Sequence, residues 1–132
     1  ETDVFNIMNM KTTVEKQIAN VMKVLGSPFR VKLLYAIGHG EACVCHLEAV
    51  LNKRQAYISQ HLMVLRDAEI LETRREGKYI FYRIADESIF GLLETAAAIL
   101  RISPNELPEI KESGTYANCA CPNCDPETAK EI

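Results

Sequence analysis

Five cysteines in two short clusters are the residues of this sequence whose type and spacing best suit binding chemistry. Cys43 and Cys45 form a Cys-x-Cys pair, and Cys119, Cys121 and Cys124 form a Cys-x-Cys-x-x-Cys group. An odd number excludes complete disulfide pairing within one chain, whereas thiolates a few residues apart can reach one ion without strain. We therefore predict that Cys43 and Cys45 bind an ion together with one or two of the three later cysteines. Three sulfurs would suit As(III) or Pb(II), and four would suit Cd(II) or Zn(II).

The first pair can share an ion only under one condition on the backbone. Side chains two residues apart in a continuous helix point about 200° away from each other. Cys43 must therefore lie ahead of the first turn of the helix that contains Cys45. Gly38 and Gly40 favour a break shortly before the pair. In the alternative interpretation, the two cysteines are small apolar residues of the core.

Hydrophobic periodicity predicts the elements that would position these residues. Helices are expected at 16–25, 28–37, 41–51, 55–68 and 87–101, and strands at 71–75 and 79–84 around the two-residue turn Glu76-Gly77. In the fourth helix, Ile58, Leu62 and Leu65 face inward and leave a polar, mostly uncharged outer face. A mainly α chain with two short helices joined by a tight turn, followed by a small basic β-hairpin, is the layout of a winged helix-turn-helix.

Composition and charge restrict the class of protein. The 132 residues are 48% hydrophobic and 25% charged, which predicts one folded domain and excludes the large barrel enzymes. The apolar runs are far shorter than the roughly 18 residues of a spanning helix. The first residues do not form a secretory signal, so we expect a cytoplasmic protein. The net charge of −3 is unevenly distributed along the chain. Residues 53–83 carry seven basic and four acidic residues, whereas residues 103–132 carry two basic and six acidic residues.

Three stretches resemble, in order and spacing, the ArsR/SmtB family of metal- and metalloid-sensing repressors. They are Glu41-Ala-Cys-Val-Cys-His-Leu, Ile58-Ser-Gln-His-Leu-Met-Val-Leu-Arg and Arg74-Arg-Glu-Gly-Lys-Tyr-Ile-Phe-Tyr-Arg. The resemblance covers about residues 14–101. It implies a homodimer that binds an operator without metal and releases it when metal binds. Cys43 and Cys45 match the family's ligands at the start of its third helix.

The chain departs from the family pattern in three places. His46 stands where many members have Asp, no cysteine precedes Cys43, and residues 87–101 contain no histidine. These departures leave As(III), Cd(II), Pb(II) and Zn(II) all open as the effector ion. His46 is either a ligand or an exposed helix residue. His61 is expected to hydrogen-bond to the DNA backbone or to its own helix, and His39 to lie in a loop.

The residues expected to contact DNA lie on the fourth helix, on the turn before it and on the hairpin. Ser59 and His61 match the family's recognition-helix signature, and Arg75, Gly77 and Tyr82 match its wing. Glutamines can pair with adenine edges, whereas arginine and lysine mainly neutralise phosphates. The alternative for the basic residues is an ordinary solvated charge set. The predicted set is Arg54, Gln55, Tyr57, Ser59, Gln60, His61, Arg74, Arg75 and Lys78.

The last predicted helix is apolar on more than one face, which is typical of burial against a partner chain. Its expected interface residues are Ile89, Leu92, Leu93, Ala96 and Leu100. A dimer doubles the DNA contacts and requires two half-sites, hence a palindromic operator. The chain then divides into an N-terminal arm at 1–13, a DNA-binding and dimerisation domain at 14–102 and a flexible tail at 103–132.

Together these features predict a repressor that is released by a thiophilic ion and is not an enzyme. The alternative is a repressor that senses oxidants or persulfides through a bond between Cys43 or Cys45 and a tail thiol. A cysteine-based oxidoreductase or metal-transfer protein is less favoured. The sequence has no Cys-x-x-Cys on a βαβ pattern and no evident set of cysteine, histidine and acid around a substrate pocket.

Overall fold

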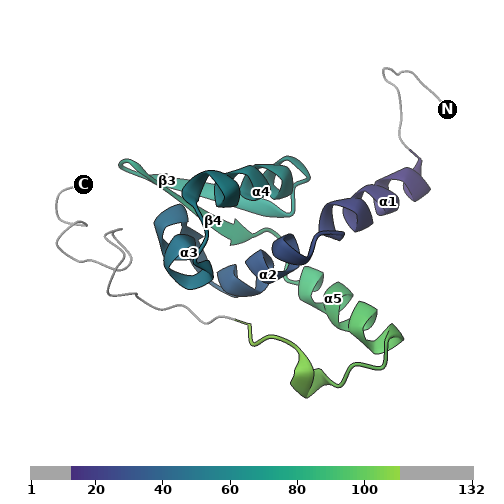
Figure 1. The fold of residues 1–132 in the computed structure, drawn as a ribbon. Helices are drawn as coiled ribbons and strands as arrows, with labels where there is room; N and C mark the ends of the chain where they lie inside the picture. Colours follow the sequence, from purple (N-terminus) through teal and green to yellow (C-terminus); the bar gives the residue numbers. More distant parts are fainter. Residues whose placement is uncertain (1–12, 111–132) are drawn as a thin grey trace.

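The computed structural model describes residues 13–110, which form five α-helices and a three-stranded antiparallel sheet (Figure 1). The fourth helix and the hairpin after it form the recognition helix and the wing of a winged helix-turn-helix. The fold class predicted from the periodicity is therefore confirmed. The elements are α1 (Val14–Leu25), α2 (Pro28–Ile37), β2 (Glu41–Cys43), α3 (Val44–Leu51), α4 (Gln55–Asp67), β3 (Leu71–Glu76), β4 (Tyr79–Ile84), α5 (Ser88–Ile99) and the 3-10 helix η1 (Pro104–Glu106).

The helix ends follow from local side-chain chemistry. The hydroxyl of Thr13 accepts a hydrogen bond from the Lys16 N–H at the start of α1, and Ser27 does the same for α2, whose first residue is Pro28. Asn52 ends α3 in the left-handed conformation, with φ of 53°. Asparagine tolerates this conformation better than most residues, so α3 and α4 are joined by a short turn.

The sheet has the order β2-β4-β3, so β4 lies in the middle. The antiparallel register places Cys43 of β2 opposite Phe81 of β4, and Phe81 opposite Arg74 of β3. These three residues therefore form one row across the sheet. Phe81 is only 1% exposed and forms a small buried cluster with Cys43.

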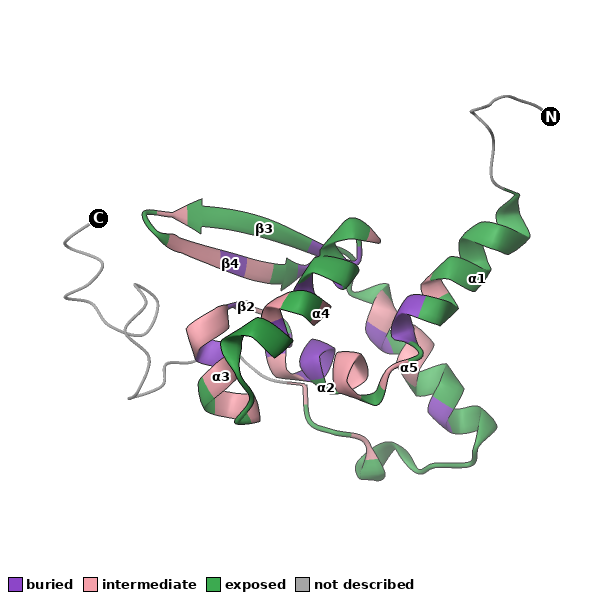
Figure 2. Cartoon of the chain, turned by 45° about the horizontal axis from the view of Figure 1, so that its top comes forward, coloured by how far each residue is buried: buried purple, intermediate pink, exposed green. Residues whose placement is uncertain are grey.

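The main core lies between the helices and one end of the sheet. Ile58, Leu62 and Leu65 are fully buried on α4, as the periodicity predicts, and they belong to one cluster with Leu33 and Leu34 of α2. Figure 2 shows the opposite face of α4 exposed. The recognition helix is thus held from one side and left open on the other.

Two sequence predictions are wrong in detail. The expected helix at 41–51 begins only at Val44, because Glu41–Cys43 forms β2 and pairs with β4. The hairpin turn consists of Gly77 and Lys78, one residue later than expected, with Gly77 at φ of 62°. The ends of the other helices differ from the prediction by one or two residues, the ordinary uncertainty of helix boundaries.

Helices α1 and α5 carry apolar side chains that this single chain leaves exposed. Ile99 is 77% and Leu100 is 71% exposed, and α1 adds Val14, Ile18 and Met22. Of the predicted interface residues, Ile89, Leu92 and Leu93 are half-buried and Ala96 and Leu100 are exposed. Figure 2 shows both helices extending from the body of the domain.

Residues 1–12 of the predicted arm and 111–132 of the predicted tail lie outside the described residues. No helix within residues 13–110 is long and apolar enough to cross a membrane.

Adjacent residues on α4 provide a test of this packing. Leu62 is fully buried and Met63 is 53% exposed. We expect Leu62→Ala to lower the free energy of unfolding by about 2–5 kcal/mol, and Met63→Ala to change it by less than about 0.5 kcal/mol. Urea unfolding at one fixed protein concentration measures both. Equal losses would contradict the assigned inward face of α4.

Candidate functional site

The two thiols of the Cys-x-Cys pair meet at the junction of β2 and α3. Cys43 is the last residue of β2 and the N-cap of α3, with an extended backbone, and its Sγ accepts a hydrogen bond from the His46 N–H at 3.4 Å. Cys45 lies in the first helical turn, and its Sγ is 2.8 Å from that of Cys43. Because Cys43 precedes the first turn, the backbone condition for joint binding is met. Two sulfurs about 2.3 Å from one zinc-like ion can be at most about 4.6 Å apart, so the pair lies within reach of a shared ion.

The thiol pair lines a groove with a volume of about 380 Å³. Cys43 is 2% exposed, whereas Cys45 is half-buried. The other walls come from α3, α4, β4 and the wing turn, and consist of Val44, Glu48, Gln55, Ser59, Lys78, Tyr79, Ile80 and Tyr82. The groove therefore joins the thiols to residues of the predicted DNA-binding set.

The described residues supply two sulfur ligands but no complete metal centre. Residues 13–110 contain no group of three or more Cys, His, Asp or Glu side chains that could hold an ion. Cys119, Cys121 and Cys124 lie outside the described residues. His46 is 5% exposed, so the interpretation of His46 as an exposed helix residue is wrong. His39 lies in the turn after α2 and contacts Glu87 at 2.6 Å.

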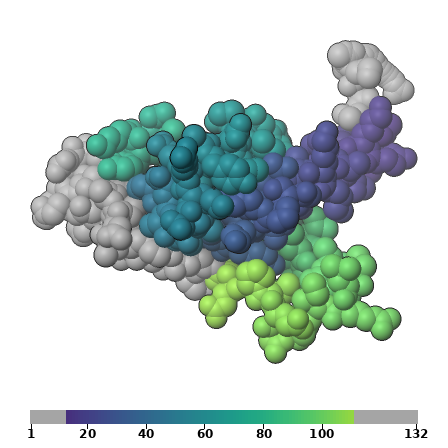
Figure 3. All heavy atoms as spheres, in the orientation of Figure 1, coloured from purple at the N-terminus to yellow at the C-terminus, as the bar shows by residue number. Residues whose placement is uncertain are grey.

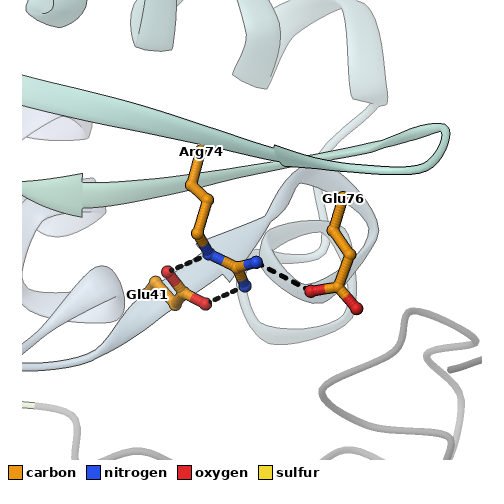
Figure 4. Close-up of polar contacts among 3 residues, drawn as sticks. All are labelled: Glu41, Arg74 and Glu76. Carbon is orange, nitrogen blue, oxygen red and sulfur yellow. Dashed lines mark hydrogen bonds and ion pairs between the residues drawn. The ribbon is translucent and has the colours of Figure 1, made fainter.

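Arg74 is held in a clamp of two carboxylates (Figure 4). Its guanidinium donates two hydrogen bonds to Glu41, the one from Nε being 3.2 Å long, and a third to Glu76 at 2.7 Å. It also lies over the Phe81 ring, 4.6 Å from the centroid. The hydrogen bonds with Glu41 and then Glu76 raise the pKa of Arg74. Arg74 thus joins the wing to the strand that carries Cys43, and two carboxylates offset its charge.

The other basic residues that are predicted to contact phosphates differ from Arg74 in their ion pairing. Arg54 is exposed directly before α4, and Arg75 and Lys78 are exposed on the wing. Among the described residues, none of these three forms an ion pair. Their positive charge therefore faces solvent.

The predicted base-reading face of α4 is open at its first turns. Gln55, Tyr57 and Gln60 are exposed, whereas Ser59 is half-buried in the groove. The Tyr57 ring packs against Phe29, with the two ring centroids 4.8 Å apart. Gln55 and Gln60 are thus accessible to a partner, whereas Ser59 lines the groove beside the thiol pair.

His61 connects α4 to α2. Its Nδ1 lies 3.1 Å from Nη1 of Arg30, and since arginine has only donors, Nδ1 is the acceptor. The imidazole also packs against the rings of Phe29 and Tyr57, with centroid separations of 5.1 and 4.7 Å. This hydrogen bond therefore runs to α2 and not to its own helix, one of the two partners expected from the sequence; the other, the DNA backbone, stays a prediction.

Sequence reasoning missed Glu41 and Phe81 as parts of the site. Both were hidden by the helix expected at 41–51, which removes the strand pairing that brings them to Cys43 and Arg74. One signal was available. Glu41 and the wing arginines have opposite charge, and opposite charges on neighbouring strands commonly pair.

Three comparisons bear on this arrangement. Residues 27–73 match the family described as bacterial regulatory proteins of the arsR family. A biofilm growth-associated repressor of Agrobacterium fabrum is 45% identical over 83 residues, which cover 63% of this chain and 71% of that protein. A cadmium resistance transcriptional regulatory protein CadC homolog of Staphylococcus aureus is 36% identical over 80 residues, covering 60% and 66%.

One solved structure extends the comparison to the fold. It is the solution structure of a homodimeric winged helix-turn-helix DNA-binding domain from Mycobacterium bovis, a possible ArsR-family transcriptional regulator. The two chains share 28% sequence identity and a TM-score of 0.60, over 68% of this chain and 85% of that one.

The environment of His61 predicts a pH dependence of stability. Burial, and then the charge of Arg30, lower the pKa of His61 from its ordinary value of 6.5. The unfolded chain therefore binds more protons below about pH 6.5, so the contribution of His61 to stability is complete above that pH and is lost as the pH falls. We expect His61→Asn to reduce the fall in unfolding free energy between about pH 7.5 and pH 5.5.

Chemical unfolding at several pH values measures this difference. The matched control is His39→Asn, because His39 is exposed and contacts Glu87 instead of Arg30. If the His61 variant follows the same pH profile as the unaltered chain, the lowered pKa assigned to His61 is wrong.

Proposed function

Since this chain belongs to the ArsR family of bacterial regulatory proteins, we propose that it is a metal-responsive transcriptional repressor that leaves its operator when a thiophilic ion binds Cys43 and Cys45. Its relatives are named as transcriptional repressors and regulators, so the chain is a regulator and not an enzyme. The observation that carries the proposal is the pair of sulfurs 2.8 Å apart in a groove that α4 also lines.

The donor atoms determine which ions the site would select. Two thiols with no adjacent carboxylate cluster among residues 13–110 favour soft ions over Mg(II) or Ca(II). One or two of Cys119, Cys121 and Cys124, from the same chain or from the partner, would complete three or four sulfurs. The names of relatives include cadmium and arsenical resistance regulators, which supports Cd(II) or As(III) as the effector. Pb(II) and Zn(II) are proposed from the chemistry of thiolate ligands alone.

Operator binding would use the open face of α4 and the wing. Gln55 and Gln60 face outward, and Arg54, Arg75 and Lys78 have no ion pair among the described residues. The glutamines would read base edges and the basic residues would contact phosphates. We infer that two chains bind a palindrome as a homodimer, with the exposed apolar side chains of α1 and α5 at the interface. The homodimeric structure from Mycobacterium bovis supports this inference.

Ion binding and operator binding are coupled by a free energy. The ion weakens the operator complex only to the extent that it binds more tightly to the free chain than to the chain on DNA. This difference in binding free energy is typically about 1–3 kcal/mol. By reciprocity, the operator weakens ion binding by the same factor. The two thiols are well placed for such coupling because they line the same groove as Gln55 and Lys78.

The accessibility of Cys45, a free thiol that is half-buried in the groove, also favours one second candidate, a thiol redox sensor. An oxidant such as a peroxide could join Cys43 or Cys45 to a tail thiol, with the two thiols oxidised to a disulfide and the peroxide reduced to water. Metal-free oxidation followed by a nonreducing gel distinguishes this candidate from the metal sensor.

The two sulfurs predict the outcome of a paired substitution. We expect the variant with Cys43→Ser and Cys45→Ser to bind operator within about twofold of the unaltered chain, since both changes are small. Release by Cd(II), Pb(II) or As(III) should be lost, because a hydroxyl is a poor ligand for soft ions. Anisotropy of a labelled duplex, selected from random palindromes, reports both quantities.

A matched control comes from the same groove. Glu48 lines it but is not a predicted ligand, so Glu48→Gln should retain release. Unaltered release in the double cysteine variant would contradict the proposal.

Neighbouring arginines on β3 predict different contributions to operator binding. Arg75 has no ion pair among the described residues, whereas Arg74 is bound by Glu41 and Glu76. Log affinity falls as log salt concentration rises. Arg75→Gln should make this slope less steep, by about one for each phosphate that the side chain no longer neutralises. Arg74→Gln should change the slope less. A larger slope change for Arg74 would show that the clamp opens on DNA.

A further inference from the structure

The groove beside the thiol pair is part of both the proposed ion site and the proposed operator-binding surface. Both sulfurs lie on one wall, and Gln55 and Ser59 of α4 and Lys78 of the wing lie on the others. Figure 3 shows the wing, α3 and the start of α4 as neighbours on one face of the molecule. Whatever the two sulfurs hold in this groove therefore lies where the operator would approach.

A single ion is too small to fill this groove. The groove has a volume of about 380 Å³, and one water takes about 30 Å³ of liquid volume. An ion of similar size would leave most of the groove open. A peptide segment of a few residues would fill it and extend over its rim.

The chain itself contains a segment with the right chemistry. Residues 112–129 include all three later cysteines and three acidic residues, and they contain no lysine or arginine. Glu48 also lines the groove, which presents Lys78, and the exposed basic residues Arg54 and Arg75 lie directly before α4 and on β3. Acidic side chains beside these groups would take the place of operator phosphates.

The segment is also long enough to reach the groove. The described chain ends by returning to the core, because Ile110 packs against the main apolar cluster. Cys119 lies nine positions after Ile110, and nine extended residues span about 30 Å. A domain of about 100 residues has a radius of gyration near 13 Å, so this reach is more than twice that radius.

We propose that residues 112–129 dock in the groove when their cysteines share an ion with Cys43 and Cys45, and that the docked segment covers the operator-binding surface. The inference rests on the proposed function and deepens it, because release then comes from competition for one surface. The shared ion links the segment to the thiol pair, which raises the local concentration of the segment at the groove.

Zero-length cross-linking of the full chain with Cd(II), in the absence of DNA, tests the proposal. A carbodiimide joins a lysine amine to a carboxylate that lies beside it, with loss of water. One equivalent of Cd(II) should raise the yield of peptides joining Lys78 to Glu112, Asp125 or Glu127 roughly fivefold or more. Lys32 is exposed on α2 and outside the groove, so its cross-links to these acids should not change. Mass spectrometry measures both yields.

A full-length variant with Cys119, Cys121 and Cys124 all replaced by serine serves as the second control. It should lose the Cd(II)-dependent rise at Lys78. The ultraviolet absorption of the cadmium–thiolate bond, recorded on the same samples, separates the two proposals. If the absorption develops without a rise at Lys78, docking is overturned and the proposed function stands. If no such absorption develops, and Cd(II) added to a separate sample of the operator complex leaves the operator bound, both are overturned.

Discussion

The site depends on one change of backbone direction, at Cys43. This residue ends β2 with φ of −88° and ψ of 169°, and it caps the helix in which Cys45 lies. In a continuous helix the two side chains would point apart; here their sulfurs are 2.8 Å apart. Pairing of β2 with β4 fixes this geometry, because it keeps Cys43 opposite the buried Phe81. The thiol pair is therefore a product of the sheet as much as of the helix.

The same sheet brings the thiols close to the DNA-binding elements. Cys43, Phe81 and Arg74 form one row across three strands, and Glu41 binds Arg74 from the strand that carries Cys43. Helix α4 closes the groove from the other side through Gln55 and Ser59. A ligand that filled this groove would thus contact both the wing and the recognition helix. Short distance favours direct competition over coupling through a remote interface.

The sequence predicted the parts of this structure that local patterns control. Ile58, Leu62 and Leu65 repeat at helical spacing and are fully buried on α4. Strand β2 could not be predicted in this way, because three residues carry too little periodicity and their partners on β4 lie about forty residues later. The clamp on Arg74 follows from that pairing through Glu41, so it was missed with it. The predicted ligands Cys119, Cys121 and Cys124 lie outside the described residues and remain predictions.

Ion and operator are proposed to weaken each other's binding through the thiol groove. The most direct test of this coupling is the affinity of Cd(II) for the chain with and without saturating operator, measured by competition with a coloured chelator. We predict weaker Cd(II) binding in the operator complex, by the same factor by which Cd(II) weakens operator binding, in the range of about 5- to 150-fold. Equal Cd(II) affinities in the two states would contradict the mechanism.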